Sequence, residues 1–221
     1  MPLRSKTFAV LGLGRFGTSV ARSLAAAGAE VLAVDKEGHR VQAIAGEVTH
    51  AVQADITDEA ALAELGLRNC EVVIVAIGSD LQASILTTLI LKDLGVPFIV
   101  AKAATDLHAR VLEKVGADRV VLPEAEMGQR VALSLTNANL MDYIAFAPGY
   151  SAVEIAAPEE SHGKSLKELN WGARFGVNVV AIRRGDQVKA APGAADVIQP
   201  GDILIAVGPD ASLQRIEHGD F

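Results

Sequence analysis

The sequence predicts an α/β fold, in which a Rossmann-like, doubly wound parallel sheet is followed by a small α+β C-terminal domain. Strand-like and helix-like segments alternate strictly over residues 7–122, the order that builds a parallel sheet with right-handed crossovers. A G-x-G-x-x-G turn lies between the first strand and the first helix. Half of the 221 residues are hydrophobic but only 4% are aromatic, so the core must consist mainly of the aliphatic side chains typical of buried parallel strands.

Each strand of the predicted sheet is a short apolar run. These runs lie at residues 7–11, 30–35, 50–53, 72–77, 98–101 and 119–122. The segment 72–77 (VVIVAI) is the clearest, because a continuous run rich in β-branched residues is typical of a strand buried on both faces. Helices are expected at residues 16–27, 37–45, 58–65, 81–94 and 106–115. Gly28, Gly95 and Gly116 mark the ends of three helices, and Thr57 is expected to cap another.

The last third of the chain has a different organisation. A helix at 124–137 leads away from the sheet, and from about residue 142 turn-rich segments separate strand-like runs. These strands are expected at 152–156, 177–182 and 203–207, with short helices at 165–170 and 210–216. We therefore place a nucleotide-binding domain at 1–140 and a C-terminal domain at 141–221, which is small enough that we expect pairing with a second copy to stabilise it.

Composition and charge argue against several classes of function. The net charge of −7 disfavours a nucleic-acid partner, which normally requires a basic face. The single cysteine, Cys70, cannot form an internal disulfide, and no Cys/His cluster has metal-binding spacing. The N-terminus lacks the apolar stretch of a signal peptide, and no window of about 20 residues is apolar enough to span a bilayer. We expect a cytoplasmic protein, whose membrane role, if any, acts through a partner.

The glycine turn is the strongest functional signal, because its context is that of a nucleotide site. Gly12 permits the tight turn, Gly14 allows backbone to approach phosphates, and Gly17 allows close helix–strand packing. The following helix start offers free N–H groups and a positive dipole end to an anion. Asp35 ends the second strand, where a carboxylate accepts hydrogen bonds from ribose hydroxyls and disfavours a 2′-phosphate.

Arg15 distinguishes this turn from that of an ordinary dehydrogenase. A cation at a helix start interacts unfavourably with the helix dipole, even if it only points into solvent. A strongly anionic ligand offsets that cost, since a guanidinium binds phosphate through two charge-assisted hydrogen bonds. We therefore interpret Arg15 as a phosphate-binding residue.

Further candidates follow the ends of the other strands. Asp55 fits either an adenine contact or a turn. Gly78 lies beside the crevice, and Lys102, at the same edge of the sheet, fits a phosphate contact as well as a solvent-exposed position. His108 and Arg110 fit a solvated helix face better than a site. Glu124 complements a helix dipole and becomes a cation ligand only if phosphates lie nearby. The predicted cofactor site also includes their neighbours Phe16, Lys36, Ile56 and Ile77.

These residues carry a resemblance to the regulator-of-potassium-conductance (RCK) family, whose members join a TrkA-N to a TrkA-C domain. The resembling segments include FAVLGLGRFG, THAVQADITDE, VVIVAIGSDLQASILTTLILK, VLEKVGADRVVLPEAEMG, KSLKELNWGARFGVNVVAIRRGD and PGDILIAVG. They cover nearly the whole chain. Two parts of these segments, AIGSDLQASILTTL and GADRVVLPE, are more distinctive of the family than the glycines. The chain is most similar to the KtrA-like regulatory subunits of Ktr potassium transporters.

The resemblance implies a cytosolic ring of eight subunits, assembled from dimers and docked on a potassium-translocating membrane subunit. It implies ATP in the conducting state and ADP in the inactive one, with NAD(H) as the ligand of the related TrkA group. By position, Gly12, Gly14, Arg15 and Phe16 would surround phosphates, and Asp35 the ribose. Asp55 and Gly78 would lie on the adenine side, Lys102 at the phosphate end, and Glu124 beside Mg²⁺ or another divalent cation shared between paired subunits.

Two departures from the family pattern leave questions open. Asp55 stands where close relatives can have Asn, so the adenine contact can differ. Some relatives bind cyclic di-AMP in the C-terminal domain through a basic residue near position 172, where this chain has Gly172 with Arg174 and Asn178 close by. Two alternative classes are a nucleotide-binding scaffold unrelated to ion transport and an NAD-dependent oxidoreductase, but for the latter the small C-terminal domain offers only His162 and His218 as acid or base. We therefore expect a regulator and not an enzyme.

Overall fold

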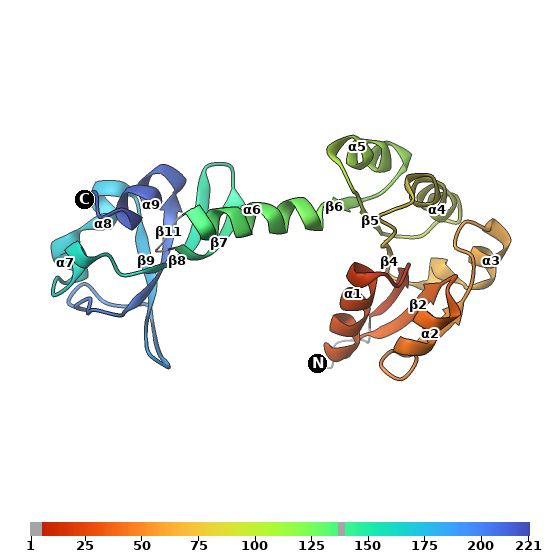
Figure 1. The fold of residues 1–221 in the computed structure, drawn as a ribbon, viewed down its shortest axis with the longest axis horizontal. Coiled ribbons are helices and arrows are strands. Elements are labelled where there is room, and N and C mark those ends of the chain that lie inside the picture. The colour runs from red at the N-terminus through yellow and green to blue at the C-terminus, as the bar shows by residue number, and fades with distance from the viewer. Residues whose placement is uncertain (1–5, 137–139) are drawn as a thin grey trace. The chain divides into compact units, whose positions relative to one another are not determined.

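The computed structural model of the chain describes residues 6–136 and 140–221. The chain divides by packing into two compact units, Met1–Glu124 and Ala125–Phe221, which are described separately below (Figure 1). The division falls near the start of helix α6 (Pro123–Thr136), ahead of the boundary that composition predicts after residue 140.

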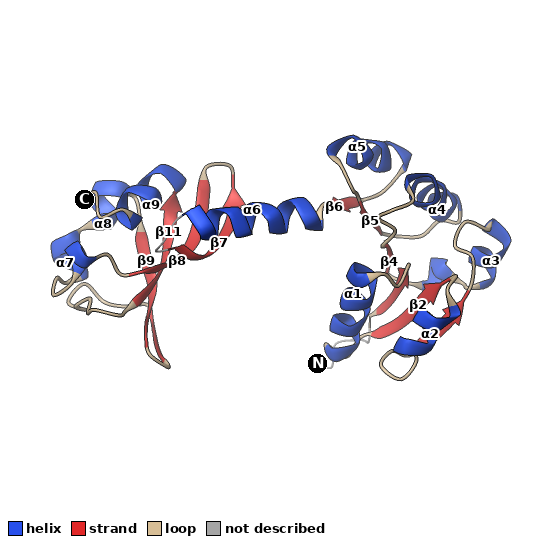
Figure 2. Cartoon of the chain, in the orientation of Figure 1, coloured by secondary structure: helices blue, strands red, loops and turns tan. Residues whose placement is uncertain are grey.

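The first unit is built on a six-stranded sheet with the order β3-β2-β1-β4-β5-β6. Figure 2 distinguishes the strands from the helices by colour. All of its strand pairs are parallel, which confirms the predicted doubly wound fold. The strands are β1 (Thr7–Leu11), β2 (Glu30–Asp35), β3 (His50–Gln53), β4 (Val72–Val75), β5 (Ile99–Lys102) and β6 (Arg119–Val121). The helices are α1 (Arg15–Ala26), α2 (Gly38–Ile44), α3 (Glu59–Glu64), the 3₁₀ helix η1 (Leu67–Asn69), α4 (Leu81–Asp93) and α5 (Asp106–Val115).

Side chains alternate between two apolar layers, one on each face of this sheet. Leu11 and Val75 belong to the layer that includes Leu91 of α4 and Leu112 of α5. The neighbouring strand residues face the opposite layer, which contains Val10, Ile74, Ala21 and Ile44. Burial on both faces explains the continuous apolar strands. The strand order reverses between β1 and β4, and in open α/β sheets ligands bind at the carboxyl ends of the strands beside such a reversal.

The start of α3 corrects one prediction. Asp58, and not Thr57, is the capping residue: its Oδ1 accepts hydrogen bonds from the backbone N–H groups of Ala60 and Ala61, at 2.9 and 3.3 Å. Thr57 instead donates its hydroxyl to Asp55 Oδ1 at 2.7 Å. The carboxylate one residue later reaches the free N–H groups of the first turn, so the prediction for Thr57 was wrong.

The second unit is built on a five-stranded antiparallel sheet with the order β10-β9-β11-β8-β7, which confirms the predicted α+β domain. The strands are β7 (Leu140–Ala147), β8 (Tyr150–Ala156), β9 (Asn178–Arg184), β10 (Gln187–Ala190) and β11 (Ile203–Pro209). In addition to α6, the helices of this unit are η2 (Glu159–Ser161), α7 (Leu166–Leu169), α8 (Trp171–Phe175) and α9 (Asp210–Glu217). Its core is formed by residues such as Ile155, Trp171, Ile182, Leu204 and Ile216. The sequence did not predict β7, β10 or α8.

Over residues 6–136 and 140–221, no helix has both the length and the apolar character needed to cross a membrane.

Candidate functional site

The glycine turn between β1 and α1 is fixed by the chain's own atoms at two of its three glycines. Gly12 has a φ of +97°, in the region that favours glycine, and its N–H donates to the carbonyl of Val34 at 2.8 Å. A Cβ on Gly17 would lie 1.9 Å from the carbonyl oxygen of Gly12, so only glycine lets α1 approach the turn this closely. The fold itself therefore requires these two glycines.

Gly14 is different, because nothing in the described chain requires a glycine there. Its φ of −68° is open to any residue, and a Cβ at this position would meet no atom within 4 Å. Gly14 is the residue before α1, whose first N–H groups have no intrahelical partner. The open space in front of these groups is where an anion can approach the backbone.

Asp35 ties the end of β2 to the glycine turn. The residue is 3% exposed, and its Oδ2 accepts a hydrogen bond from the backbone N–H of Leu13 at 2.6 Å. Its Oδ1 accepts from the N–H of Glu37 at 2.8 Å, and Arg40 Nη1 lies 3.3 Å from Oδ2. Each carboxylate oxygen can accept more than one bond, so the predicted contact to ribose hydroxyls is compatible with this geometry. The sequence did not single out Arg40.

Lys102 is the centre of a second group, which brings together four of the predicted residues. It ends β5, and its Nζ lies 2.5 Å from Glu124 Oε1 in the first turn of α6. The same ammonium lies 5.7 Å from the centroid of the Phe16 ring, within the range of a cation–π contact. A Cβ on Gly78 would lie 2.8 Å from this nitrogen, so glycine makes room for the lysine. Phe16, Gly78, Lys102 and Glu124 therefore form one cluster.

The charges in this cluster favour an ionised Glu124. The hydrogen bond from Lys102 is the main cause that lowers the pKa of the Glu124 carboxyl below its ordinary value. Arg15 lowers that pKa further by its positive charge, which places Arg15 within electrostatic reach of the cluster. The lysine side chain is 11% exposed and the glutamate 69%, so the carboxylate is the solvent-facing partner.

Asp55 serves the turn after β3. Its Oδ1 accepts hydrogen bonds from both the N–H and the hydroxyl of Thr57, and these bonds lower the pKa of the Asp55 carboxyl. This is the turn role that the sequence left open, and an adenine contact by Asp55 stays a prediction. Of the predicted neighbours, Ile56 is buried, Ile77 is half-buried and Lys36 is exposed.

His108 corrects the expectation of a solvated face. Its side chain is buried, and its Nδ1 accepts a hydrogen bond from the N–H of Ala104 at 3.2 Å, while Arg110 is exposed as expected. Burial lowers the pKa of His108, so the ring is neutral at pH 7 and belongs to the packing of α5.

No group of three or more His, Cys, Asp or Glu side chains that could hold a metal ion occurs among the described residues. Among the described residues, Glu124 is therefore not part of a group of three such side chains. A divalent cation at Glu124 would take its other ligands from phosphate oxygens and water, the arrangement that Mg²⁺ commonly adopts in nucleotide sites.

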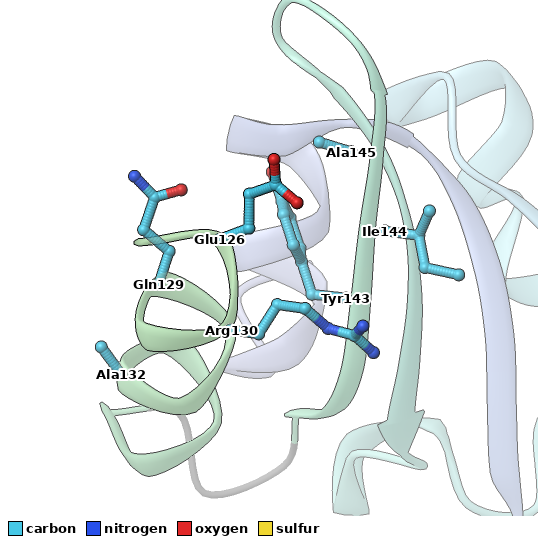
Figure 3. A pocket seen from close by; sticks show the side chains of 7 residues that line it. All are labelled: Glu126, Gln129, Arg130, Ala132, Tyr143, Ile144 and Ala145. Carbon is cyan, nitrogen blue, oxygen red and sulfur yellow. The ribbon is translucent and has the colours of Figure 1, made fainter. Parts of the chain in front are cut away.

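Two of the hollows among the described residues of the second unit bear on function. One, of about 620 Å³, lies between α6 and β7 and is lined by Glu126, Gln129, Arg130, Ala132, Tyr143, Ile144 and Ala145. Figure 3 shows Glu126 and Arg130 extending from α6 toward Tyr143, while Gln129 and Ala132 point away from the strand. The other, of about 340 Å³, is lined by residues of α7, α8 and β9, and includes Gly172 and Asn178.

Two domain families match the chain. The TrkA-N domain matches residues 8–123 and the TrkA-C domain residues 151–218. The Ktr system potassium uptake protein C of Bacillus subtilis (strain 168) is 47% identical over 212 residues, which cover 96% of each chain. The Ktr system potassium uptake protein A of the same organism is 44% identical over 216 residues, covering 98% of this chain and 97% of the relative.

Solved structures share the fold at lower identity. The GsuK channel bound to NAD matches with a TM-score of 0.67 and 17% identity, covering 98% of this chain and 40% of that chain. GsuK bound to ADP matches with a TM-score of 0.53 and 18% identity, covering 62% of this chain and 36% of that chain. This chain spans less than half of either GsuK chain, and the likeness concerns the fold alone.

Proposed function

The chain belongs to the family whose members join a TrkA-N domain to a TrkA-C domain, and on this premise we propose that it is a cytoplasmic, nucleotide-sensing regulatory subunit of a membrane potassium uptake system. The observation that carries the proposal is the open space at Gly14 beside Arg15, whose charge also acts on Glu124, the ion-pair partner of Lys102. Both relatives, matched over almost their whole length, are named as proteins of a potassium uptake system and not as enzymes.

ATP and ADP are the proposed ligands, with their phosphates at the start of α1. A ligand shifts a conformational equilibrium only through a difference in its affinity for the two states, so a sensor must read the terminal phosphate. Arg15 and Lys102 are the cations available for this phosphate, and Asp35 lies at the strand end where ribose hydroxyls would bind. A coupling of about 1–3 kcal/mol is typical of such regulation.

Glu124 is the proposed contact to a divalent cation. Its carboxylate is ionised and faces solvent, and it forms an ion pair with Lys102. The cation would bind phosphate oxygens together with Glu124, which allows ATP and ADP to be told apart through the number of phosphate ligands they offer.

The proposed assembly is a ring of eight subunits, built from dimers and bound to a potassium-translocating membrane protein. Support comes from the second unit, where large apolar side chains are exposed on α6 and β7. They include Met127, Val131, Leu135, Ile144 and Phe146. Met127, Val131 and Leu135 follow one another at four-residue spacing and therefore form one stripe along α6, as expected for a helix that contacts another protein.

NAD(H) is the alternative ligand of the same site, and GsuK, which shares the fold, is bound to NAD in one structure and to ADP in another. Cyclic di-AMP is a further candidate, for the hollow at Gly172 and Asn178 in the second unit. That hollow has Lys167 but no arginine among its lining residues, so it offers little positive charge for the two phosphodiester groups of this ligand.

The test is a calorimetric titration of the full chain with ATP, ADP, NADH and cyclic di-AMP, repeated for Arg15→Ala. We expect ATP and ADP to bind, and the variant to weaken both by about ten- to a hundredfold, as the loss of charge-assisted hydrogen bonds of about 1.5–3 kcal/mol implies. Arg68→Ala, an exposed arginine of η1, is the matched control and should bind as the unaltered chain does. Tight NADH binding with redox turnover would overturn the proposal.

A further inference from the structure

A third hollow, of about 640 Å³, opens in the first unit beside the glycine turn. Leu13 and Gly14 of the turn form part of its wall, and none of its lining residues is acidic. The remaining lining consists of arginine and hydroxyl side chains, namely Arg15, Arg22, Arg40, Thr18, Ser19 and Ser23. This composition suits an anion, and the nucleotide contacts proposed above make no use of Arg40.

The three arginines are engaged to different degrees. Arg22 is held by Glu47, to which its Nε and Nη2 donate hydrogen bonds of 2.8 and 2.7 Å. Arg40 makes a longer contact of 3.3 Å to Asp35, and no described residue forms a hydrogen bond or ion pair with Arg15. A guanidinium has five N–H donors, so Arg15 and Arg40 retain most of their capacity for a ligand.

The pairing of Arg40 with Asp35 changes what that carboxylate does to a ligand. Asp35 alone would repel a phosphate on the ribose, since two anions would meet at the end of β2. Both of its oxygens already accept backbone hydrogen bonds, from Leu13 and Glu37, and Arg40 places a positive charge beside Oδ2. An arginine close to this position is the feature that accommodates a 2′-phosphate in dinucleotide-binding sheets.

We propose, on the basis of the nucleotide function above, that this hollow is a second phosphate subsite in which Arg40 binds a phosphate on the 2′-oxygen of the adenosine ribose, while Arg15 stays with the 5′-phosphates. The ligands it admits are 2′-phosphorylated adenine nucleotides, the chemical class of NADP and 2′,5′-ADP. Arg40 is then the residue that determines specificity at the ribose, and it reverses the discrimination expected from Asp35 alone.

The test compares two ligands that differ only by the phosphate in question, 5′-AMP and 2′,5′-ADP, titrated into the full chain by calorimetry. We expect 2′,5′-ADP to bind about tenfold or more tightly, because the phosphate gains charge-assisted hydrogen bonds. Two further arms use 3′,5′-ADP, which moves the same charge to the neighbouring oxygen, and inorganic phosphate alone. Neither should reproduce the gain.

Substitution of Arg40 provides the second readout. In Arg40→Ala the preference should reverse, so that 2′,5′-ADP binds more weakly than 5′-AMP, because Asp35 remains without its cation. Arg40→Lys keeps the charge but not the two-pronged geometry, and should retain part of the preference. This variant also tests the subsite if Arg40→Ala does not fold. Arg68→Ala again serves as the control and should keep the full preference.

The outcomes separate this inference from the proposed function. If ADP and 5′-AMP bind but 2′,5′-ADP binds equally or less well, the 2′-phosphate subsite is wrong and the nucleotide sensor stands. If inorganic phosphate binds as tightly as 2′,5′-ADP, the hollow is a free-anion site and the ribose assignment is overturned. If no adenine nucleotide binds, both proposals fail together.

Discussion

The two units of this chain differ in the kind of surface that they expose. In the first unit the strands are covered on both faces and the glycine turn is held by its own contacts, yet Gly14 and Arg15 line a hollow that the described residues leave open. In the second unit the core is closed beneath α8 and α9, yet α6 and β7 expose a series of large apolar side chains. In the function that we propose, the first unit binds the nucleotide at this space and the second unit contacts other subunits through this apolar surface.

The largest effect is expected where the fold of the first unit and its site meet, in the glycine turn. Gly17→Ala would place a Cβ 1.9 Å from a backbone oxygen, so the turn must move, at a cost of about 3 kcal/mol or more in the free energy of unfolding. Nucleotide affinity should fall more than a hundredfold in the same variant. Thermal unfolding and calorimetry measure the two effects.

Gly14→Ala is the matched change that separates ligand from fold. The new Cβ has no atom of the described residues within 4 Å, so the free energy of unfolding should change by about 1 kcal/mol or less. Nucleotide affinity should nevertheless fall at least tenfold, because the methyl group occupies the space in front of the helix start. A Gly14→Ala protein that binds as the unaltered chain does would remove the reason for placing a phosphate there.

In the second unit, Leu135→Asp should weaken self-association. Leu135 is 79% exposed and ends the apolar stripe of α6. Loss of a buried leucine contact of about 1.5–3 kcal/mol corresponds to ten- to a hundredfold weaker association, and the added charge increases the effect. Sedimentation velocity over a range of concentrations measures it, with Gln214→Asp on the exposed face of α9 as control. An unchanged assembly would show that α6 is not the contact surface.

Glu124→Gln tests the cation contact with a smaller effect. The substitution removes the ionised carboxylate but keeps its size, so the stimulation of ATP binding by Mg²⁺ should fall about tenfold. ADP affinity without Mg²⁺ should change by no more than about threefold. An equal loss for both nucleotides, with and without Mg²⁺, would assign Glu124 to the support of Lys102 and not to a cation.

The sequence predicted the first unit better than the second, and the reason is burial. Strands covered on both faces are continuous apolar runs bounded by glycines, so all six were placed within two residues at each end. In the second unit every residue of β10 is exposed, and β7 exposes Met141, Ile144 and Phe146, so neither strand shows the alternation that identifies a strand. For β7, the exposed apolar side chains agree with the partner that we propose for this surface.

For the candidate site, the sequence predicted most of the residues but not which of them contact one another. Lys102 and Glu124 were each predicted with an alternative, and only the fold shows that a strand end and a helix start bring their charges within 2.5 Å. Arg40 was overlooked, although its place five residues after the strand-ending Asp35 was available as a signal. Contacts between elements depend on how α2 packs against β2, and local patterns do not contain that information.

The smallest effect concerns the acid stability of the second unit. Asp202 is buried before β11, and its carboxylate accepts hydrogen bonds from Arg184 Nε and Nη2 at 2.7 and 2.8 Å and from the N–H of Gln199. The bond from Arg184 is the main cause that lowers the pKa of Asp202 in the folded state. The unfolded chain then binds more protons, so this stabilisation is fully present above the ordinary pKa of about 3.9 and is lost as the pH falls through the folded value.

Asp202→Asn should therefore lower the unfolding temperature at pH 7 by a few degrees and make it less sensitive to acid below about pH 4. Asp186→Asn, in the exposed turn between β9 and β10, should change neither quantity. The same scans sharpen the contrast between the units, because a bound nucleotide stabilises only the unit that holds it. If the units unfold in separate transitions, ADP should raise the unfolding temperature of the first unit and Asp202→Asn should lower that of the second. A single transition whose temperature responds to both changes would mean that the two units unfold as one cooperative structure.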